Sequence, residues 1–385
     1  MNTIKQLIEK YCPDGVEYKK LGEVCKTIPA PVKVKTSQYF KKGKYAIIDQ
    51  GQSKIAGYTN DEFILIPKGE YVLYGDHTCT VKYVNFRFAQ GADGLKILKT
   101  EQLLTKYLYY ALSNFNIKNN EYKRHWSIVK EIYLPVPPIS VQREIVRILD
   151  SFTSLEAELE AELEARRKQY EYYRDQLLSF KHLSGGGKNE VEWKTIKDVC
   201  LSICSGGTPN TQNKDFYNGN IPWLRTQEVD WKDIYKTDVL ITEAGLKNSS
   251  AKLIPANCVI VAMYGATAAK VAINKIPLTT NQACCNLQID ESICNNRYVY
   301  QWLCKNYEVL KAMGEGSQQN LNAKKIKNFP IPIPPLSTQR RIVSILDRFE
   351  SLVNDITTGL PAEITARHQQ YEYYRDQLLS FKRKS

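Results

Sequence analysis

Polar side chains that suit hydrogen bonding to base edges and phosphates gather in several stretches of the 385-residue chain. Lys and Arg donate to guanine and to phosphates, while the Asn and Gln amides match the donor and acceptor of adenine. For any single member, a surface or helix-capping role is at least as good an interpretation. The candidates before residue 139 are Lys41, Lys44, Gln50, Lys54, Lys82, Lys123, Arg124 and Trp126. Those between residues 191 and 335 are Asn210, Thr211, Lys214, Arg225, Gln227, Lys247, Gln318, Gln319, Asn322, Lys324 and Lys325.

Residues that could carry catalysis or hold a metal form no usable pattern, so we predict neither a catalytic residue nor a metal site. Both Pro-Pro pairs lack the preceding Asp or Asn of the motif in common adenine methyltransferases. Residues 17–19 (Glu-Tyr-Lys) follow the Pro-Asp at 13–14 too closely for a nuclease hairpin, and we interpret them as a strand edge. The Gly-Gly-Gly-Lys at 185–188 lacks the flanking residues of a phosphate loop. The 10 Cys include no Cys-x-x-Cys pair, which favours buried thiols over zinc.

The positive charge is concentrated in the segments that contain the candidate loops. The chain carries 53 Lys and Arg against 41 Asp and Glu, a net charge of +12, which favours a polyanionic partner. Residues 1–140 hold a net +8 and residues 182–330 a net +4, whereas residues 141–181 and 331–385 hold −2 and +2. This distribution suits phosphate contacts by the two basic segments, although a solvated basic surface is the competing interpretation.

The chain is a tandem repeat of one unit. The thirteen residues QYEYYRDQLLSFK occur at 169–181 and again at 370–382. Upstream, LPVPPISVQREIVRILD at 134–150 matches IPIPPLSTQRRIVSILD at 331–347, and VEYKKLGEVC at 16–25 matches VEWKTIKDVC at 191–200. The intervening sequence diverges, which indicates a shared scaffold that carries two different specificities.

A long helix is predicted after each Pro-Pro pair, with Ser140 and Ser337 as N-caps, because apolar residues then recur every three or four positions. Two such helices can bury their apolar stripes against each other as an antiparallel coiled coil; packing of each helix only on its own domain is the alternative. A Gly-Leu-Pro at 359–361 should interrupt the second helix. The stripe residues selected for the first helix are Phe152, Leu159, Tyr170, Tyr173 and Leu177, and for the second Phe349, Ile356, Tyr371, Tyr374 and Leu378.

The first helix contains a four-residue repeat, LEAELEAELEAR, at 155–166. This repeat is either a solvated helical spacer or a ruler whose length is set by the number of tetrads. The glycine-rich stretch that follows the first helix is typical of a flexible linker.

The order of these elements resembles the specificity subunit of type I restriction–modification systems. The Pro-Pro-x-x-x-Gln-Arg and Gln-Tyr-Glu-Tyr-Tyr-Arg blocks are similar to its spacers. Residues 205–224, 280–284 and 316–335 resemble its second-domain elements, and 47–51 and 74–98 its first-domain elements. The fold class implied is α+β, with two target-recognition domains, two long helices in an antiparallel coiled coil and a pseudo-two-fold internal repeat. The predicted boundaries are a first recognition domain at 1–138, a first spacer helix at 139–181, a linker at 182–190, a second recognition domain at 191–335 and a second spacer helix at 336–385.

The resemblance further implies a non-enzymatic reader of double-stranded DNA whose two half-sites flank an unspecified gap. Two modification subunits would supply S-adenosylmethionine chemistry, and two restriction subunits would supply ATP- and Mg²⁺-dependent cleavage, so this chain itself would bind no cofactor. With no signal peptide and no apolar run of about 20 residues, we expect a cytoplasmic protein without a membrane partner.

Three alternatives stay open at this point. One is a coiled-coil adaptor whose basic domains bind nucleic acid without specificity. A second is a stand-alone nuclease or methyltransferase, which no sequence motif supports. The third is an inactive or phase-variable specificity subunit.

Overall fold

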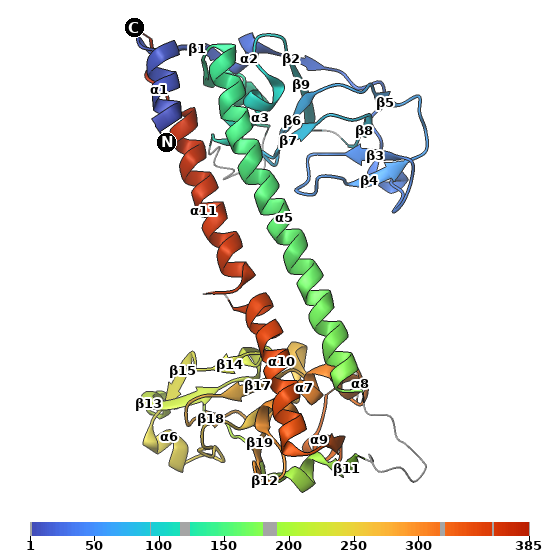
Figure 1. Cartoon of the computed structure of the whole chain (residues 1–385), viewed down its shortest axis with the longest axis vertical. Helices are drawn as coiled ribbons and strands as arrows, with labels where there is room; N and C mark the ends of the chain where they lie inside the picture. The colour runs from blue at the N-terminus through green and yellow to red at the C-terminus, as the bar shows by residue number, and fades with distance from the viewer. Residues whose placement is uncertain are drawn as a thin grey trace. The chain divides into compact units, whose positions relative to one another are not determined.

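The computed structural model describes residues 2–92, 94–115, 124–179, 191–315, 320–355 and 358–384. The chain forms two compact units (Figure 1): the first is made of residues 1–161 and 363–385, and the second of residues 162–362. Each unit therefore combines one predicted recognition domain with the start of one spacer helix and the end of the other.

The recognition domain of the first unit contains two four-stranded sheets and a short two-stranded ribbon. The sheet β2-β9-β6-β7 is antiparallel throughout, while β4-β3-β8-β5 includes the parallel pair β3 and β8. The elements are α1 (Asn2–Tyr11), β1 (Glu17–Lys20), α2 (Leu21–Val24), β2 (Cys25–Ile28), β3 (Tyr45–Ile48), β4 (Gly57–Thr59), β5 (Leu65–Ile66), β6 (Tyr71–Gly75), β7 (Val81–Val84), β8 (Phe88–Gln90), β9 (Leu95–Thr100), α3 (Thr105–Ser113), α4 (Trp126–Val129) and β10 (Tyr133–Val136).

The recognition domain of the second unit has a five-stranded sheet of order β12-β19-β16-β17-β14 and a three-stranded sheet of order β15-β13-β18. Strands β13 and β18 are parallel, as β3 and β8 are in the first unit. The elements are β11 (Glu192–Thr195), β12 (Cys200–Ser205), β13 (Tyr217–Leu224), β14 (Asp233–Ile234), β15 (Val239–Ile241), α6 (Glu243–Lys247), β16 (Val259–Ala262), β17 (Val271–Asn274), β18 (Thr279–Thr280), β19 (Cys284–Ile289), α7 (Asn296–Lys305), α8 (Tyr307–Ala312), α9 (Ala323–Lys327) and β20 (Pro330–Ile333).

The matching sequence blocks form matching structures. In the first unit β1 pairs antiparallel with the Pro-rich strand β10, and in the second β11 pairs in the same way with β20. The Glu-Tyr-Lys at 17–19 lies within β1, as the strand interpretation predicted. In each unit, this ribbon directly precedes the start of a spacer helix.

The spacer helices are α5 (Ile139–Leu177), α10 (Leu336–Asn354) and α11 (Leu360–Leu379). The interruption predicted at 359–361 therefore occurs, because α10 ends at Asn354 and α11 begins at Leu360. The predicted N-caps Ser140 and Ser337 were wrong. The carbonyl oxygens of the prolines at 138 and 335 accept the first helical hydrogen bonds, so each serine already lies in the first turn.

The spacer helices pair antiparallel within each unit. In the first unit, the rings of Phe152 and Tyr374 stack at 5.2 Å and His368 lies 2.8 Å from Glu156. In the second unit, the rings of Tyr173 and Phe349 stack at 5.3 Å. The two stacks join equivalent positions of the repeat, so the predicted α+β fold with paired helices and an internal repeat is confirmed.

Among the predicted stripe residues that the structure describes, Tyr173 is the most exposed, at 38%, and the others are buried or half-buried. Leu378 is buried, and Leu159, Tyr170, Leu177 and Tyr371 are half-buried. Ile356 lies outside the described residues.

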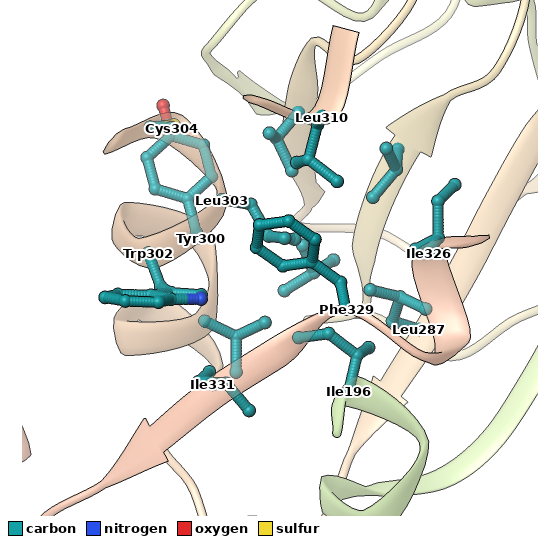
Figure 2. Packing of buried hydrophobic residues seen from close by; sticks show 14 of the residues in the cluster. Ile196, Leu287, Tyr300, Trp302, Leu303, Cys304, Leu310, Ile326, Phe329 and Ile331 are labelled. Atoms are coloured by element: carbon teal, nitrogen blue, oxygen red, sulfur yellow. The ribbon is translucent and has the colours of Figure 1, made fainter. Parts of the chain in front are cut away.

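In each unit the core sits between one helix, α3 or α7, the main sheet and the start of a spacer. In the second unit (Figure 2), Trp302 and Leu303 of α7 and Ile331 of β20 converge around Phe329. The first unit repeats this arrangement with Leu112 of α3 and Leu134 of β10, which correspond to Leu303 and Ile331. Of the helices that the structure describes, none has the length and apolar character needed to cross a bilayer.

Candidate nucleic-acid interface

The loop that follows β3, residues 49–54, is fixed by hydrogen bonds from Lys82. Its Nζ donates hydrogen bonds to the carbonyl oxygens of Asp49 at 2.8 Å and Ser53 at 2.7 Å, and the side chain is almost fully buried. Burial lowers the pKa of the Lys82 ammonium. Because its hydrogen bonds close the two ends of loop 49–54, the contribution of Lys82 in this structure is to shape the loop.

Two hydroxyl groups fix the backbone of the same loop. Thr78 and Thr80 both donate to the carbonyl oxygen of Gln50, at 2.5 and 2.7 Å. The side-chain oxygen of Gln50 accepts from the backbone N–H of His77 at 3.1 Å, so this predicted contact residue is partly built into the scaffold. Two exposed side chains of this loop are the amide of Gln52 and the ammonium of Lys54.

The second recognition domain builds an equivalent loop after β13, the strand that corresponds to β3. The hydroxyl of Thr267 donates to the carbonyl oxygen of Thr226 at 2.8 Å, as Thr78 and Thr80 do to Gln50. Arg225 lies 3.5 Å from both Glu228 and Asp238, while Gln227 is exposed. Each domain therefore presents an exposed glutamine on a loop whose backbone is anchored by a threonine hydroxyl.

A second segment approaches the loop region of the second domain at Gly206–Thr208. A Cβ at Gly206 would lie 1.9 Å from the carbonyl oxygen of Thr280, so only glycine permits this approach. The approach lets the hydroxyl of Thr208 hydrogen-bond to the exposed side chain of Gln282. The sequence did not single out Thr208 or Gln282, although both lie in the segments that carried the family resemblance.

The other first-domain candidates are more scattered. Lys41 and Lys44 are exposed before β3, and Arg124 is exposed before α4. Trp126 opens α4, where its backbone N–H donates to Asp76 and its ring lies 6.0 Å from that of Tyr74, so it also packs in the core. Lys123 lies outside the described residues.

The remaining second-domain candidates divide into exposed and structural residues. Asn210, Thr211, Lys214, Lys247 and Lys324 are exposed. Asn322 is also exposed, but its side chain caps α9 by accepting from the backbone N–H of Lys325 at 3.0 Å, and the Lys325 ammonium donates to Glu315 and to the carbonyl oxygen of Met313. Gln318 and Gln319 lie outside the described residues. DNA contact thus stays a prediction for every candidate, and the anchored loops are the group whose backbone is fixed by side-chain hydrogen bonds.

The described residues contain no cluster of three or more His, Cys, Asp or Glu side chains that could hold a metal ion. The cysteines of the second domain are mostly buried, and burial raises the pKa of Cys258 and Cys285 to about 12. Thiols of this kind stay protonated and unreactive near neutral pH. What the anchored loops offer is hydrogen bonding and positive charge.

Comparison with known proteins agrees with this geometry. The family model described as "Type I restriction modification DNA specificity domain" matches twice, at residues 13–165 and 188–366. The chain is 37% identical to the type I restriction enzyme EcoR124I/EcoR124II specificity subunit of Escherichia coli, over 96% of this chain and 95% of that protein. It is 32% identical to a putative type I restriction enzyme specificity subunit of Haemophilus influenzae, over 99% and 100% of the two chains.

Solved structures share the fold at much lower sequence identity. The crystal structure of a type I restriction–modification S subunit from M. genitalium matches with a TM-score of 0.61 and 14% identity, over 95% of this chain and 96% of that one. This likeness concerns the fold alone. It covers both recognition domains and both spacers of the present chain.

Proposed function

Because the chain belongs to the type I restriction–modification DNA specificity family, we propose that its two recognition domains each read one half of a bipartite DNA target. The observation that carries this proposal is the anchored loop that occurs once in each domain. The two loops share their position after equivalent strands but differ in sequence, Asp-Gln-Gly-Gln at 49–52 and Arg-Thr-Gln-Glu at 225–228. Equivalent scaffolds with different side chains suit two different half-sites separated by a gap.

The loop chemistry supports direct readout. A glutamine can accept from and donate to adenine at once, and an ordered loop keeps its amide in place without a large ordering cost on binding. Gln52 and Gln227 are exposed on such loops. The net charge of +8 and +4 on the two domain segments adds the phosphate attraction that non-specific binding requires.

The catalytic steps and their cofactors belong, in this proposal, to partner subunits. Two modification subunits would bring S-adenosylmethionine, and two restriction subunits would bring ATP and Mg²⁺. The exposed faces of the nearly neutral spacer helices are the surfaces that suit protein contact. We place the assembled complex in the cytoplasm, where its DNA target lies.

The test is DNA binding and methylation by the chain assembled with its modification subunit. Each loop should govern one half-site, so Gln52→Ala should relax selectivity at one position of one half-site and Gln227→Ala at one position of the other. The expected loss is about 1–3 kcal/mol of discrimination per lost bidentate contact. Lys68→Ala, which removes an exposed lysine outside the loops, is the matched control.

Competition by unrelated DNA separates specific reading from the adaptor alternative, because a steep salt dependence is common to specific and non-specific binding. A specificity subunit should keep its bound target in the presence of unrelated DNA. Binding that unrelated DNA competes away equally well, or no binding at all, would favour a coiled-coil adaptor and contradict the proposal.

A further inference from the structure

A buried glutamine makes the same hydrogen bonds at the start of each spacer. The Oε1 atom of Gln142 accepts from the backbone N–H of Leu104 at 2.9 Å, and its Nε2 donates to the carbonyl oxygen of Pro137 at 2.8 Å. The Oε1 atom of Gln339 accepts from the N–H of Asn295 at 2.8 Å, and its Nε2 donates to the carbonyl oxygen of Pro334 at 2.8 Å. Both glutamines are at most 2% exposed.

These bonds join three elements at one point in each unit, which we call the joint. The glutamine lies in the first turn of the spacer, its N–H partner is the residue that precedes helix α3 or α7, and its carbonyl partner follows the Pro-rich strand. A primary amide is a neutral group that can accept from one backbone group and donate to another simultaneously. Because the site is buried, loss of the amide would leave a donor and an acceptor without partners.

Two further contacts tie the same elements together in both units. The hydroxyls of Tyr107 and Tyr298 donate to the carbonyl oxygens of Pro135 and Pro332, at 3.0 and 2.9 Å. One residue earlier in α3 and in α7, a cation pairs with an aspartate of the spacer: Lys106 with Asp150 at 2.6 Å, and Arg297 with Asp347 at 2.8 Å. The set is repeated although the surrounding recognition sequences have diverged.

A small change of angle at this joint has a large effect at a distance. Helix α5 has 39 residues, which corresponds to a length of about 58 Å at 1.5 Å per residue. A tilt of about 3° at its first turn would displace the far end of such a helix by about 3 Å. The displacement lies across the helix axis and is similar in size to the rise of one base pair, about 3.4 Å, so it would change how a half-site at that end meets the duplex without changing the length of the helix.

We propose that Gln142 and Gln339 are positioning residues that fix the direction in which each spacer leaves its recognition domain, and thereby the gap length that the subunit accepts. This inference rests on the proposed function. It adds the two joints to helix length as determinants of the gap.

The experiment uses the chain assembled with its modification subunit and a panel of duplexes that carry both half-sites. The gap is the natural one, one base pair shorter or one base pair longer, and the initial rate of methyl transfer is measured for each. Gln142→Met and Gln339→Met keep the size of the side chain but remove both hydrogen bonds. We expect each variant to lose about tenfold of the rate ratio between the natural and the altered gaps, the scale set by unpaired buried groups.

Gln6→Met, at an exposed glutamine of α1, is the matched control and should keep the wild-type ratio. Thermal unfolding and binding to an isolated half-site are measured alongside, because a purely structural loss would lower these and reduce all rates together. If a glutamine variant does not assemble, the pair of Lys106 and Asp150 replaces it. Lys106→Asp should then relax the gap preference, and the double variant with Asp150→Lys should restore it.

The outcomes are distinguishable. A wild-type complex that methylates all gaps equally would overturn the proposed function and this inference with it. A wild-type complex that discriminates, with folded joint variants that discriminate equally well, would overturn the inference alone.

Discussion

Equivalent cations at the two joints should differ greatly in their contribution to stability. Arg297 is 17% exposed, and its guanidinium contacts Asp347 at 2.8 Å, Glu350 at 2.9 Å and Asp233 at 3.3 Å. Lys106 occupies the same position in the first unit, where it pairs with Asp150 while more than a third of its side chain is exposed. We predict that Arg297→Met destabilises its unit far more than Lys106→Met does.

The magnitudes follow from burial. Removal of one partner from a buried ion pair costs about 3–5 kcal/mol, because the remaining charge stays desolvated; the partial exposure of Arg297 favours the lower end, about 3 kcal/mol. An exposed pair such as that of Lys106 contributes about 1 kcal/mol or less. The expected difference between the two variants is therefore about 2 kcal/mol or more.

The loss in Arg297→Met should also depend on pH. Burial raises the pKa of the Glu350 carboxyl, and the guanidinium of Arg297 opposes this rise. Without Arg297, the pKa of Glu350 in the folded chain should rise further above its unfolded value. A carboxyl with a raised pKa favours the folded state at low pH and loses this effect as pH rises through the folded pKa. The variant should therefore be closer to wild type at pH 5 than at pH 8.

Native-state hydrogen exchange read out by mass spectrometry is the suitable assay, because it reports opening of α3 and α7 separately in a protein of two units. Peptides from α7 should lose protection in Arg297→Met, and peptides from α3 should change little in Lys106→Met. Equal losses in the two variants, or a loss in Arg297→Met that grows toward low pH, would refute the reasoning.

Three further predictions concern other parts of the molecule. Tyr107→Phe and Tyr298→Phe each remove a buried hydrogen bond to a proline carbonyl, and each should cost about 1–1.5 kcal/mol in urea unfolding; Tyr235→Phe, at an exposed tyrosine, should be neutral. One extra Leu-Glu-Ala-Glu within residues 155–166 lengthens α5 by about 6 Å, so methylome sequencing should show a gap longer by one or two base pairs, and an unchanged gap would rule out the ruler. Burial raises the pKa of Cys285 to about 12, so iodoacetamide at pH 8 should label it only after unfolding, and rapid labelling of the native chain would contradict its burial.

The repeat explains why so much of the fold could be predicted from the sequence. The identical Gln-Tyr-Glu-Tyr-Tyr-Arg blocks place Tyr173 and Tyr374 where each stacks on the phenylalanine of the opposing helix. The first Pro-Pro pair and helical periodicity set the start of α5, and the Gly-Leu-Pro at 359–361 indicates the break before α11, because both are local consequences of sequence. The N-caps were predicted wrongly because a proline carbonyl, which carries no side-chain signal, accepts the first hydrogen bonds.

The candidate site was harder to predict because its anchors lie far apart in sequence. Lys82 stands in a strand with apolar neighbours and was chosen for its charge, yet strand alternation points it inward under loop 49–54. The threonines that fix the loop backbones, such as Thr80 and Thr267, are 30 and 41 residues from their partners. Spacing along the chain does not reveal such pairs. The joint glutamines were likewise visible only as part of a repeated motif.

The most direct test of the central claim is methylome sequencing of a host that expresses this chain with its modification subunit. We expect one modified target made of two defined half-sites separated by a gap of fixed length. Exchange of residues 1–138 for the recognition domain of another family member should change one half-site and leave the other intact. A modified site without a gap, or no sequence-specific modification by an assembled complex, would contradict the account.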